Sequence, residues 1–243
     1  MSQKKQILKI IEITYHAHHG VPGYRMMQQL LQQKSIKRSK LTVYKYMKTL
    51  GLRSVIMRKK AKYMKGEQHK LFTNELKRNF TATRPNEKWC TDFTYITLSN
   101  GQKRYNCSIL DLYNRSIVAS LNSKHIDAQL AISTLKMALH KHKIEGNILL
   151  HSDQGSQFAS KDFTDFCKNN NVVQSMSKAG CPYDNAPMER FYNTLKNEYI
   201  NLHYFKDDKS LENGLNEYIF GWYNCVRPHT YNGGVPPAKV RLR

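Results

Sequence analysis

Hydrophobic residues in the first fifty positions recur at the three- to four-residue spacing of an α-helix. A Gly-Val-Pro-Gly turn at 20–23 separates the first two groups, and Ser39 and Gly51 are suited to cap and to end the third. The pattern therefore predicts three short helices. Their inward-facing residues are Ile7, Leu8, Ile10 and Ile11, then Met26, Met27, Leu30 and Leu31, then Val43, Met47 and Leu50.

The third of these helices carries polar and basic residues on its outer side. We expect Thr42, Tyr44, Lys45 and Lys48 to point away from the small core. Two short helices followed by such a helix are typical of a helix-turn-helix, in which the last helix enters the major groove of DNA. Small helical bundles share the same periodicity, so the pattern alone does not decide between them.

After residue 86 the period changes to that of a mixed sheet with helices. Apolar and alternating stretches predict strands at 89–98, 105–110, 115–121, 147–151 and 172–175, the first two joined by an Asn-Gly turn at 100–101. Helices are expected at 127–140, 160–168, 185–200 and 211–225. Two of them have a predicted buried stripe: Ala128, Ile132, Leu135 and Leu139 in the first, and Leu211, Leu215, Tyr218, Ile219 and Trp222 in the last. This order predicts an α/β fold.

The charge of the chain separates these two regions. Of the formal net charge of +21, residues 1–90 carry +17 and the remainder only +4. A basic front on a nearly balanced rear favours binding of nucleic acid over a merely solvated surface. We expect a helix-turn-helix domain at 1–52, a basic linker at 53–86 that can follow phosphates, a catalytic core at 87–225 and a tail at 226–243.

Several classes of protein are excluded or disfavoured. No stretch approaches the roughly 18 apolar residues of a membrane span, and Lys9 and Glu12 interrupt the apolar run that a signal peptide needs. The five cysteines form no CxxC pair, so neither a disulfide framework nor a zinc finger is predicted. His16, His18 and His19 fit a solvated helix end better than a metal site. We expect a soluble protein without a membrane partner in a reducing cytoplasm.

Three carboxylates are candidates for phosphate chemistry, since no phosphate-binding glycine loop is present. Asp92 lies in the first predicted strand, Asp153 closes the fourth, and Glu189 lies in the first turns of the helix that begins near 185. Oxygen ligands of this kind suit Mg²⁺, and two such ions can activate a nucleophile and stabilise a leaving oxygen. Each acid taken singly also fits a helix cap or a solvated position.

The sequence around these carboxylates resembles a known family. The segments are Trp89–Ile96 (WCTDFTYI), His151–Phe158 (HSDQGSQF), Asp184–Lys196 (DNAPMERFYNTLK), Tyr223–His229 (YNCVRPH) and Gly234–Ala238 (GVPPA), with Gly23-Tyr24-Arg25 and Thr42-Val43-Tyr44 in front. Together they resemble a DDE transposase of the bacterial insertion-sequence OrfB type, with a retroviral-integrase-like core. Asp153 and Glu189 are separated by 35 residues, the family's spacing. Val235 and Tyr231 depart from its usual tail.

The resemblance implies a ribonuclease H-like fold in which Asp92, Asp153 and Glu189 bind Mg²⁺, for which Mn²⁺ can substitute. It implies cleavage of double-stranded DNA at the terminal inverted repeats of an element and transfer of the 3′ ends to target DNA, by a homo-oligomer in the bacterial cytoplasm at the nucleoid. The family's upstream half, supplied by frameshift fusion, is expected as a further partner. By helical geometry Lys196 lies within about 20° of Glu189 and Asn193 about 40° to the other side. Lys196, Asn193 and Arg25 are expected to contact DNA.

Other interpretations remain open from the sequence. The chain could be a catalytically inactive DNA-binding regulator or partner subunit, or a structure-selective nuclease on the same fold. Asp184 is expected to cap the helix that carries Glu189, and Asp111 to be a turn residue. His151 shares a strand face with Asp153, where it touches the site or fills the layer. Trp89 and Trp222 are expected in the core.

Overall fold

The computed structural model describes residues 3–56, 72–142, 144–178 and 181–241. These residues fall into two compact units, one formed by the N-terminal helices with residues 227–235 and the other by the rest. The basic run 58–60 of the expected linker lies outside the described residues. Within the described part, no helix is long and apolar enough to span a membrane.

The first unit contains the three expected helices. They are α1 (Gln3–Ala17), α2 (Tyr24–Gln33) and α3 (Lys40–Thr49), and their shared core includes Ile11, Met27, Leu31 and Val43, all fully buried. The Ser39 side chain accepts a hydrogen bond from the backbone N–H of Thr42 (3.1 Å), so the predicted cap of α3 is confirmed. Gly51 follows α3 with a φ of +69°, a left-handed conformation that favours glycine.

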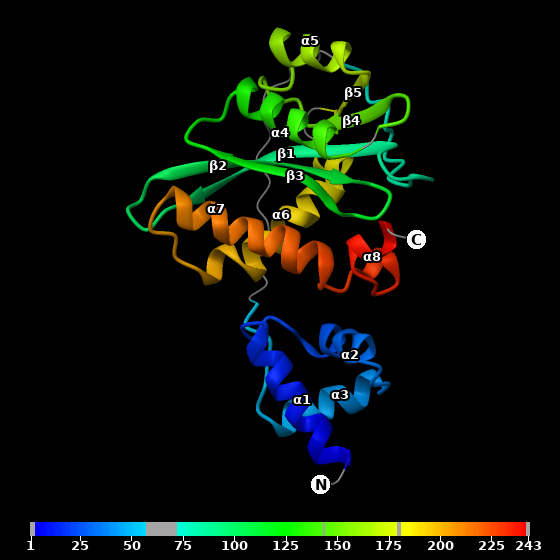
Figure 1. The fold of residues 1–243 in the computed structure, drawn as a ribbon, viewed down its shortest axis with the longest axis vertical. Helices are drawn as coiled ribbons and strands as arrows, with labels where there is room; N and C mark the ends of the chain where they lie inside the picture. The colour runs from blue at the N-terminus through cyan, green and yellow to red at the C-terminus, as the bar shows by residue number, and fades with distance from the viewer. Residues whose placement is uncertain (1–2, 57–71, 143, 179–180, 242–243) are drawn as a thin grey trace. The chain divides into compact units, whose positions relative to one another are not determined.

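The second unit is built on a five-stranded mixed sheet, which confirms the α/β expectation (Figure 1). The strand order is β3-β2-β1-β4-β5, in which β1, β2 and β3 pair antiparallel and β1, β4 and β5 pair parallel. The strands are β1 (Lys88–Thr97), β2 (Lys103–Asp111), β3 (Ile117–Ser123), β4 (Ile148–Ser152) and β5 (Val172–Met176).

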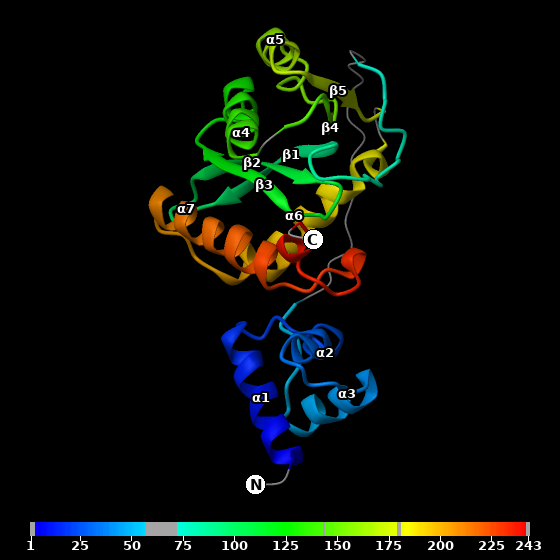
Figure 2. The ribbon, with the colours of Figure 1, turned by 45° about the vertical axis from the view of Figure 1, so that its right-hand side comes forward.

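Helices cover both faces of this sheet. Figures 1 and 2 show α4 and α5 on one face and α6 and α7 on the other. Successive residues of β1 point to opposite faces of the sheet. Trp89 packs on the face covered by α4 and α5, and Cys90 on the face covered by α6 and α7. The helices are α4 (Ala128–Lys141), α5 (Lys161–Asn169), α6 (Ala186–Glu198), α7 (Asp208–Asn216) and α8 (Pro237–Arg241), with single turns at η1 (Pro182–Asn185), η2 (Ile200–Leu202) and η4 (Thr230–Asn232).

Two details of the predicted helices differ in the structure. The predicted stripe of α4 is partly confirmed: Leu135 is fully buried, and Ile132 and Leu139 are half-buried and pack against the same core cluster. The residues that α4 buries are Leu130, Ala131, Thr134, Leu135 and Ala138. The last helix starts earlier than predicted, at Asp208, and continues past Asn216 as the π-helical η3 (Glu217–Tyr223). Trp222 in that segment is half-buried and packs against the core.

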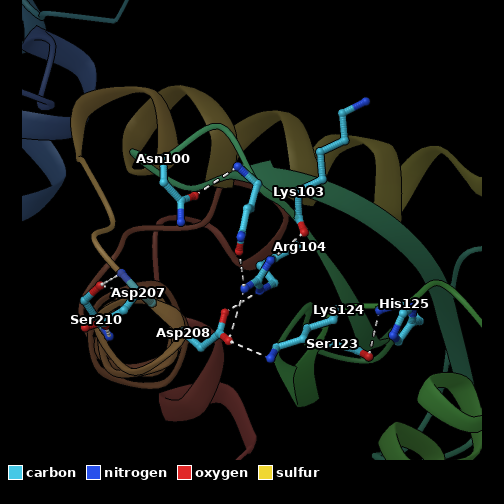
Figure 3. Close-up of polar contacts among 10 residues, drawn as sticks. Asn100, Lys103, Arg104, Ser123, Lys124, His125, Asp207, Asp208 and Ser210 are labelled. Atoms are coloured by element: carbon cyan, nitrogen blue, oxygen red, sulfur yellow. Dashed lines mark hydrogen bonds and ion pairs between the residues drawn. The ribbon is translucent and has the colours of Figure 1, made fainter.

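The start of α7 is tied to the sheet by a polar cluster (Figure 3). Arg104 on β2 forms an ion pair with Asp208, and the Lys124 ammonium lies 3.9 Å from the same carboxylate. Asp207 and Ser210 form a capping box just before these contacts. These bonds hold the start of α7 against the sheet.

Residues outside the predicted core also pack on this unit. Leu76 and Ala82, which were expected in the linker, are buried in the same cluster as Cys90. The backbone N–H of Met176 donates to the carbonyl of Thr73 (3.2 Å) and the Leu76 N–H donates to the Ser175 hydroxyl (3.0 Å), so the start of the segment 72–86 lies against the edge strand β5. In the expected tail, the carbonyl of Pro237 accepts a bond from the Asn114 side chain (2.9 Å).

Candidate active site

Parallel pairing of β1 with β4 brings the first two candidate carboxylates together. The register aligns Cys90 with His151, and two further residues along each strand place Asp92 beside Asp153. Neighbouring strands lie about 4.8 Å apart, so the two side chains meet at the same end of the sheet. Asp92 is half-buried, whereas Asp153 retains an exposed surface just beyond the last residue of β4.

Glu189 reaches the same region because α6 is bonded to β1 around Asp92. The Asn185 side chain donates to the carbonyl of Thr91 (3.0 Å), and the Tyr192 hydroxyl donates to the carbonyl of Asp92 (2.7 Å). These contacts hold the first turns of α6, where Glu189 lies half-buried, against the strand. The sequence analysis missed both Asn185 and Tyr192. Tyr192 stands three residues after Glu189 and so shares its side of the helix, which is the signal that could have found it.

The three carboxylates interact electrostatically. The pKa of Asp92 is raised well above its ordinary value by desolvation, then by the charge of Asp153 and less by that of Glu189, while the Phe93 N–H and Lys196 oppose the shift. Desolvation also raises the pKa of Asp153 and of Glu189. Like charges gathered in a partly desolvated place favour either a proton or a cation.

The donor set fits a hard divalent cation. One oxygen of Asp92 accepts a bond from the Phe93 N–H (2.7 Å), and one oxygen of Asp153 accepts from the Gly155 N–H (3.0 Å). In the described part of the chain, none of the three acids forms an ion pair within 4 Å, and the only described cation that acts on the pKa of Asp92 is the more distant Lys196. The described residues contain no group of three His, Cys, Asp or Glu side chains already gathered closely enough to hold a metal ion.

Gly155 matters for the position of Asp153. A Cβ atom at this residue would lie 3.0 Å from Asp153 Oδ1 and 3.1 Å from Gln157 Oε1. A side chain here would push the Asp153 and Gln157 side chains away by a few tenths of an ångström, and the Gly155 N–H donates to the same carboxylate oxygen. The contact between Gly155 and the carboxylate is not visible in the sequence pattern.

Lys196 lies near the carboxylates, while Asn193 makes a local contact. The Lys196 ammonium is 4.7 Å from the ring centroid of Tyr95 on β1. Burial lowers the pKa of Lys196, and the charge of Asp92 partly opposes that shift. Asn193 is exposed, and its side-chain oxygen accepts a bond from Asn197 (2.8 Å).

In the first unit, an unpredicted residue joins two of the expected DNA contacts. Arg25 donates from Nε to the Tyr24 hydroxyl (3.0 Å), and the Tyr24 and Tyr44 rings meet edge to face with centroids 5.6 Å apart. Lys45 and Lys48 are exposed on α3. Thr42 differs from them, because its hydroxyl shares a hydrogen bond with Ser39 (2.9 Å) and so belongs to the cap.

The remaining acids have structural partners. The expectation that Asp184 caps α6 is wrong. Its buried carboxylate forms an ion pair with Arg78 and accepts a hydrogen bond from the Lys178 N–H. Asp111 does accept a turn N–H, from Tyr113 (3.0 Å), and is also fully buried against Arg241. Arg78 is more than 100 residues from Asp184, and no local pattern could have revealed the pair.

The other predicted packing residues lie inside the fold. His151 is a packing residue of β4. Its ring forms hydrogen bonds with Ser175 and Ser177, and burial lowers its pKa to about 4. Trp89 is fully buried, as expected.

Family models and relatives agree with this arrangement. Residues 2–60 match an HTH-like domain, and residues 82–182 and 170–237 match two models described as integrase core domain. The structure is similar to a chain of the simian T-cell lymphotropic virus intasome, with a TM-score of 0.57 at 18% identity over 74% of this chain and 61% of that one. The HTLV-2 integrase catalytic core in complex with magnesium gives a TM-score of 0.50 at 17% identity, covering 65% of this chain and 98% of that one. These likenesses show the fold, which is ribonuclease H-like.

Curated relatives give the family. The chain is 36% identical to transposase InsF of insertion sequence IS3A from Escherichia coli over 68% of its length, and spans 57% of that relative. It is 34% identical to the putative transposase InsK of insertion sequence element IS150 from the same species, over 97% of this chain and 82% of that protein. The chain therefore belongs to the insertion-sequence transposases of the OrfB type, which carry an integrase core domain.

Proposed function

We propose that the chain catalyses metal-dependent cleavage of DNA at element ends and transfer of the resulting strands, with Asp92, Asp153 and Glu189 as the metal ligands. The observation that carries this proposal is the parallel pairing of β1 with β4, which sets Asp92 beside Asp153, together with the bonds that attach the Glu189 helix to β1 around Asp92. Three carboxylates brought to one end of the sheet suit a cation-binding site, and their mutual effect on the pKa of Asp92 supports this.

The chain's own residues hold the reacting groups. Asp92 and Asp153 are fixed by strand pairing and by bonds from Phe93 and Gly155, and Glu189 by the attachment of α6 to β1. A bound Mg²⁺, or Mn²⁺ in its place, would polarise the scissile phosphate and lower the pKa of an attacking water. No covalent intermediate with the protein is required.

Lys196 is proposed to bind a DNA phosphate beside the carboxylates. Its ammonium lies over the exposed Tyr95 ring, and it is near enough to Asp92 for that charge to affect its pKa. A cation here would attract the DNA backbone next to the scissile bond. Asn193, which is exposed in the second half of α6, is proposed as a weaker contact on the same side.

DNA reading is proposed to lie in the first unit. The proposed division is a DNA-binding domain at 1–52, a segment at 53–86 that was expected as a linker and whose part 72–86 packs on the core, the core at 87–225 and a tail at 226–243. Tyr44, Lys45 and Lys48 are exposed on α3, and Arg25 is exposed on α2. With Thr42 at the start of α3, they would contact the terminal inverted repeats, since phosphate contacts position a protein and base contacts specify the site.

The proposed partners are double-stranded element ends and target DNA, other copies of this chain assembled on the DNA, and an upstream-frame protein that supplies further DNA binding. Nucleoid association in the bacterial cytoplasm follows from the net charge of +21 and the DNA substrate.

The test is incubation of the full chain with a duplex that carries the element's terminal repeat, in Mg²⁺ and separately in Mn²⁺. We expect nicked ends with a free 3′-hydroxyl and products in which that end is joined to a second duplex. A nuclease would give cleavage without joined products, and an inactive regulator would protect the repeat without either. The presence of all three carboxylates and the family relationship disfavour both alternatives.

A further inference from the structure

A polar network holds the turn that precedes α6, the helix that carries Glu189. Its centre is Asp184, which is 2% exposed and stands five residues before Glu189. Its carboxylate accepts bonds from three donors: the Arg78 guanidinium (2.6 Å), the Asn74 side chain (2.9 Å) and the backbone N–H of Lys178 (2.9 Å). Two of the three donors come from the segment 72–86, which precedes the core in the sequence.

The same network reaches the strand that carries Asp153. The His151 ring bonds to Ser175 (2.9 Å) and Ser177 (3.1 Å) on and after β5. The backbone N–H of Ser177 donates to the carbonyl of Ser152 (2.9 Å), the residue that immediately precedes Asp153. The Ser175 hydroxyl also accepts the backbone N–H of Leu76 (3.0 Å), again from the segment before the core.

Stability alone does not explain this arrangement. Asp184 is buried, whereas the Arg78 side chain is 56% exposed, and an ion pair with one solvent-exposed partner adds little net stability. Asp184 and Arg78 are joined across more than 100 residues, and their contact connects the loop before α6 to a segment that β5 holds at the edge of the sheet. The network thus links the residue before Asp153 to the turn before Glu189.

We propose that Asp184, clamped by Arg78 and Asn74, is a positioning residue that holds the start of α6 so that Glu189 faces Asp153. The segment 72–86 is then a structural part of the active site. This inference rests on the proposed function, because it assumes that the two acids share a metal ion. Outer partners of metal ligands affect metal affinity or activity by about 10- to 100-fold when they are removed.

The test compares Asp184→Asn with a matched control, Asp111→Asn, in the full chain. Asp111 is likewise fully buried, with Arg241 at 2.8 Å and the backbone N–H of Asn86 at 2.9 Å, but it lies toward the other end of β1, opposite Trp89. Mn²⁺ binding is measured by calorimetric titration, and cleavage by kcat and by KM for element-end DNA. We expect Asp184→Asn to weaken Mn²⁺ binding by about 10-fold or more and to lower kcat with KM for DNA unchanged. Asp111→Asn should lower the melting temperature but leave Mn²⁺ binding as in the wild type.

Arg78 provides the second variant, because its side chain is 56% exposed and its truncation removes little buried packing. Arg78→Ala should weaken Mn²⁺ binding in the same direction, and Arg78→Lys should restore part of it. Equal Mn²⁺ affinity in Asp184→Asn and Asp111→Asn, or unchanged affinity in Arg78→Ala, would overturn the inference. If Asp184→Asn does not fold, Arg78→Ala decides. A wild-type chain that neither binds Mn²⁺ nor cleaves would instead refute the proposed function.

Discussion

Replacing Asp92 by Asn should make the metal-free chain more stable while it removes activity. Asn keeps the shape of the side chain and can still accept the bond from the Phe93 N–H. It removes one charge from a group in which desolvation and the charges of Asp153 and Glu189 raise the pKa of Asp92. The repulsion that the folded chain bears at neutral pH is therefore relieved in the variant.

The size of the effect follows from the strand geometry. Two unit charges roughly 5 Å apart, as on neighbouring strands, repel by about 3 kcal/mol at an effective dielectric constant of 20. Asp92 is only half-buried and Asp153 is partly exposed, so water and salt reduce this value to about 1–2 kcal/mol. For a unit of this size, that is a rise in melting temperature of roughly 2–8 °C.

The pH dependence has a definite sign. Because the folded-state pKa of Asp92 lies above its ordinary value of 3.8, the folded chain binds more protons than the unfolded chain in the interval between the two. Stability of the wild type should fall as pH rises through that interval and reach its low plateau above the folded pKa. Asp92→Asn should reduce this fall.

Tryptophan fluorescence provides the assay, since both tryptophans, Trp89 and Trp222, belong to the catalytic unit. Melting is followed in chelator and again with Mn²⁺. We expect the wild type to gain stability with Mn²⁺ and Asp92→Asn to start higher and gain less. A lower melting temperature for the variant in chelator, with an unchanged Mn²⁺ response, would refute the reasoning.

Three further predictions concern single residues. Gly155→Ala should lower cleavage by about 10-fold with DNA affinity unchanged, because the added Cβ would displace the Asp153 side chain. Gly221→Ala serves as the control, because a Cβ there meets nothing within 4 Å, and equal cleavage rates in the two variants would contradict the prediction. Lys196→Ala should reduce the slope of log affinity against log salt by about one, and an unchanged slope in a salt titration would exclude a phosphate contact. Ser39→Ala should cost about 1 kcal/mol and speed hydrogen exchange in α3 by ~5-fold, whereas unchanged exchange would show that the cap does not stabilise the helix.

Local patterns predict much of the fold. The period-2 strands, the turn at 100–101 and the cap at Ser39 are each specified within a few residues, and the structure contains all of them. The buried side of α4 is harder, because Ala, Leu and Ile occur on more than one side of that helix. Which side is buried depends on how closely the helix approaches β2 and β3, a tertiary property.

The candidate site is likewise only partly predictable from the sequence. Asp92, Asp153 and Glu189 stand in recognisable segments, and strand order brings the first two together. The residues that hold them are less visible from sequence. The local sequence predicts that Asp184 caps a helix, whereas in the structure its partner is Arg78, which was expected in the linker. Long-range partners of this kind leave no periodic signal.

The most direct test of the account is a joining assay with three single variants of the full chain. Asp92→Asn, Asp153→Asn and Glu189→Gln each keep the shape of the side chain and remove one charge that a divalent metal needs. The account predicts that each variant binds element-end DNA as the wild type does and gives neither cleaved nor joined product in Mg²⁺. Near wild-type product from any one of them would show that its carboxylate is not a metal ligand and would contradict the central claim.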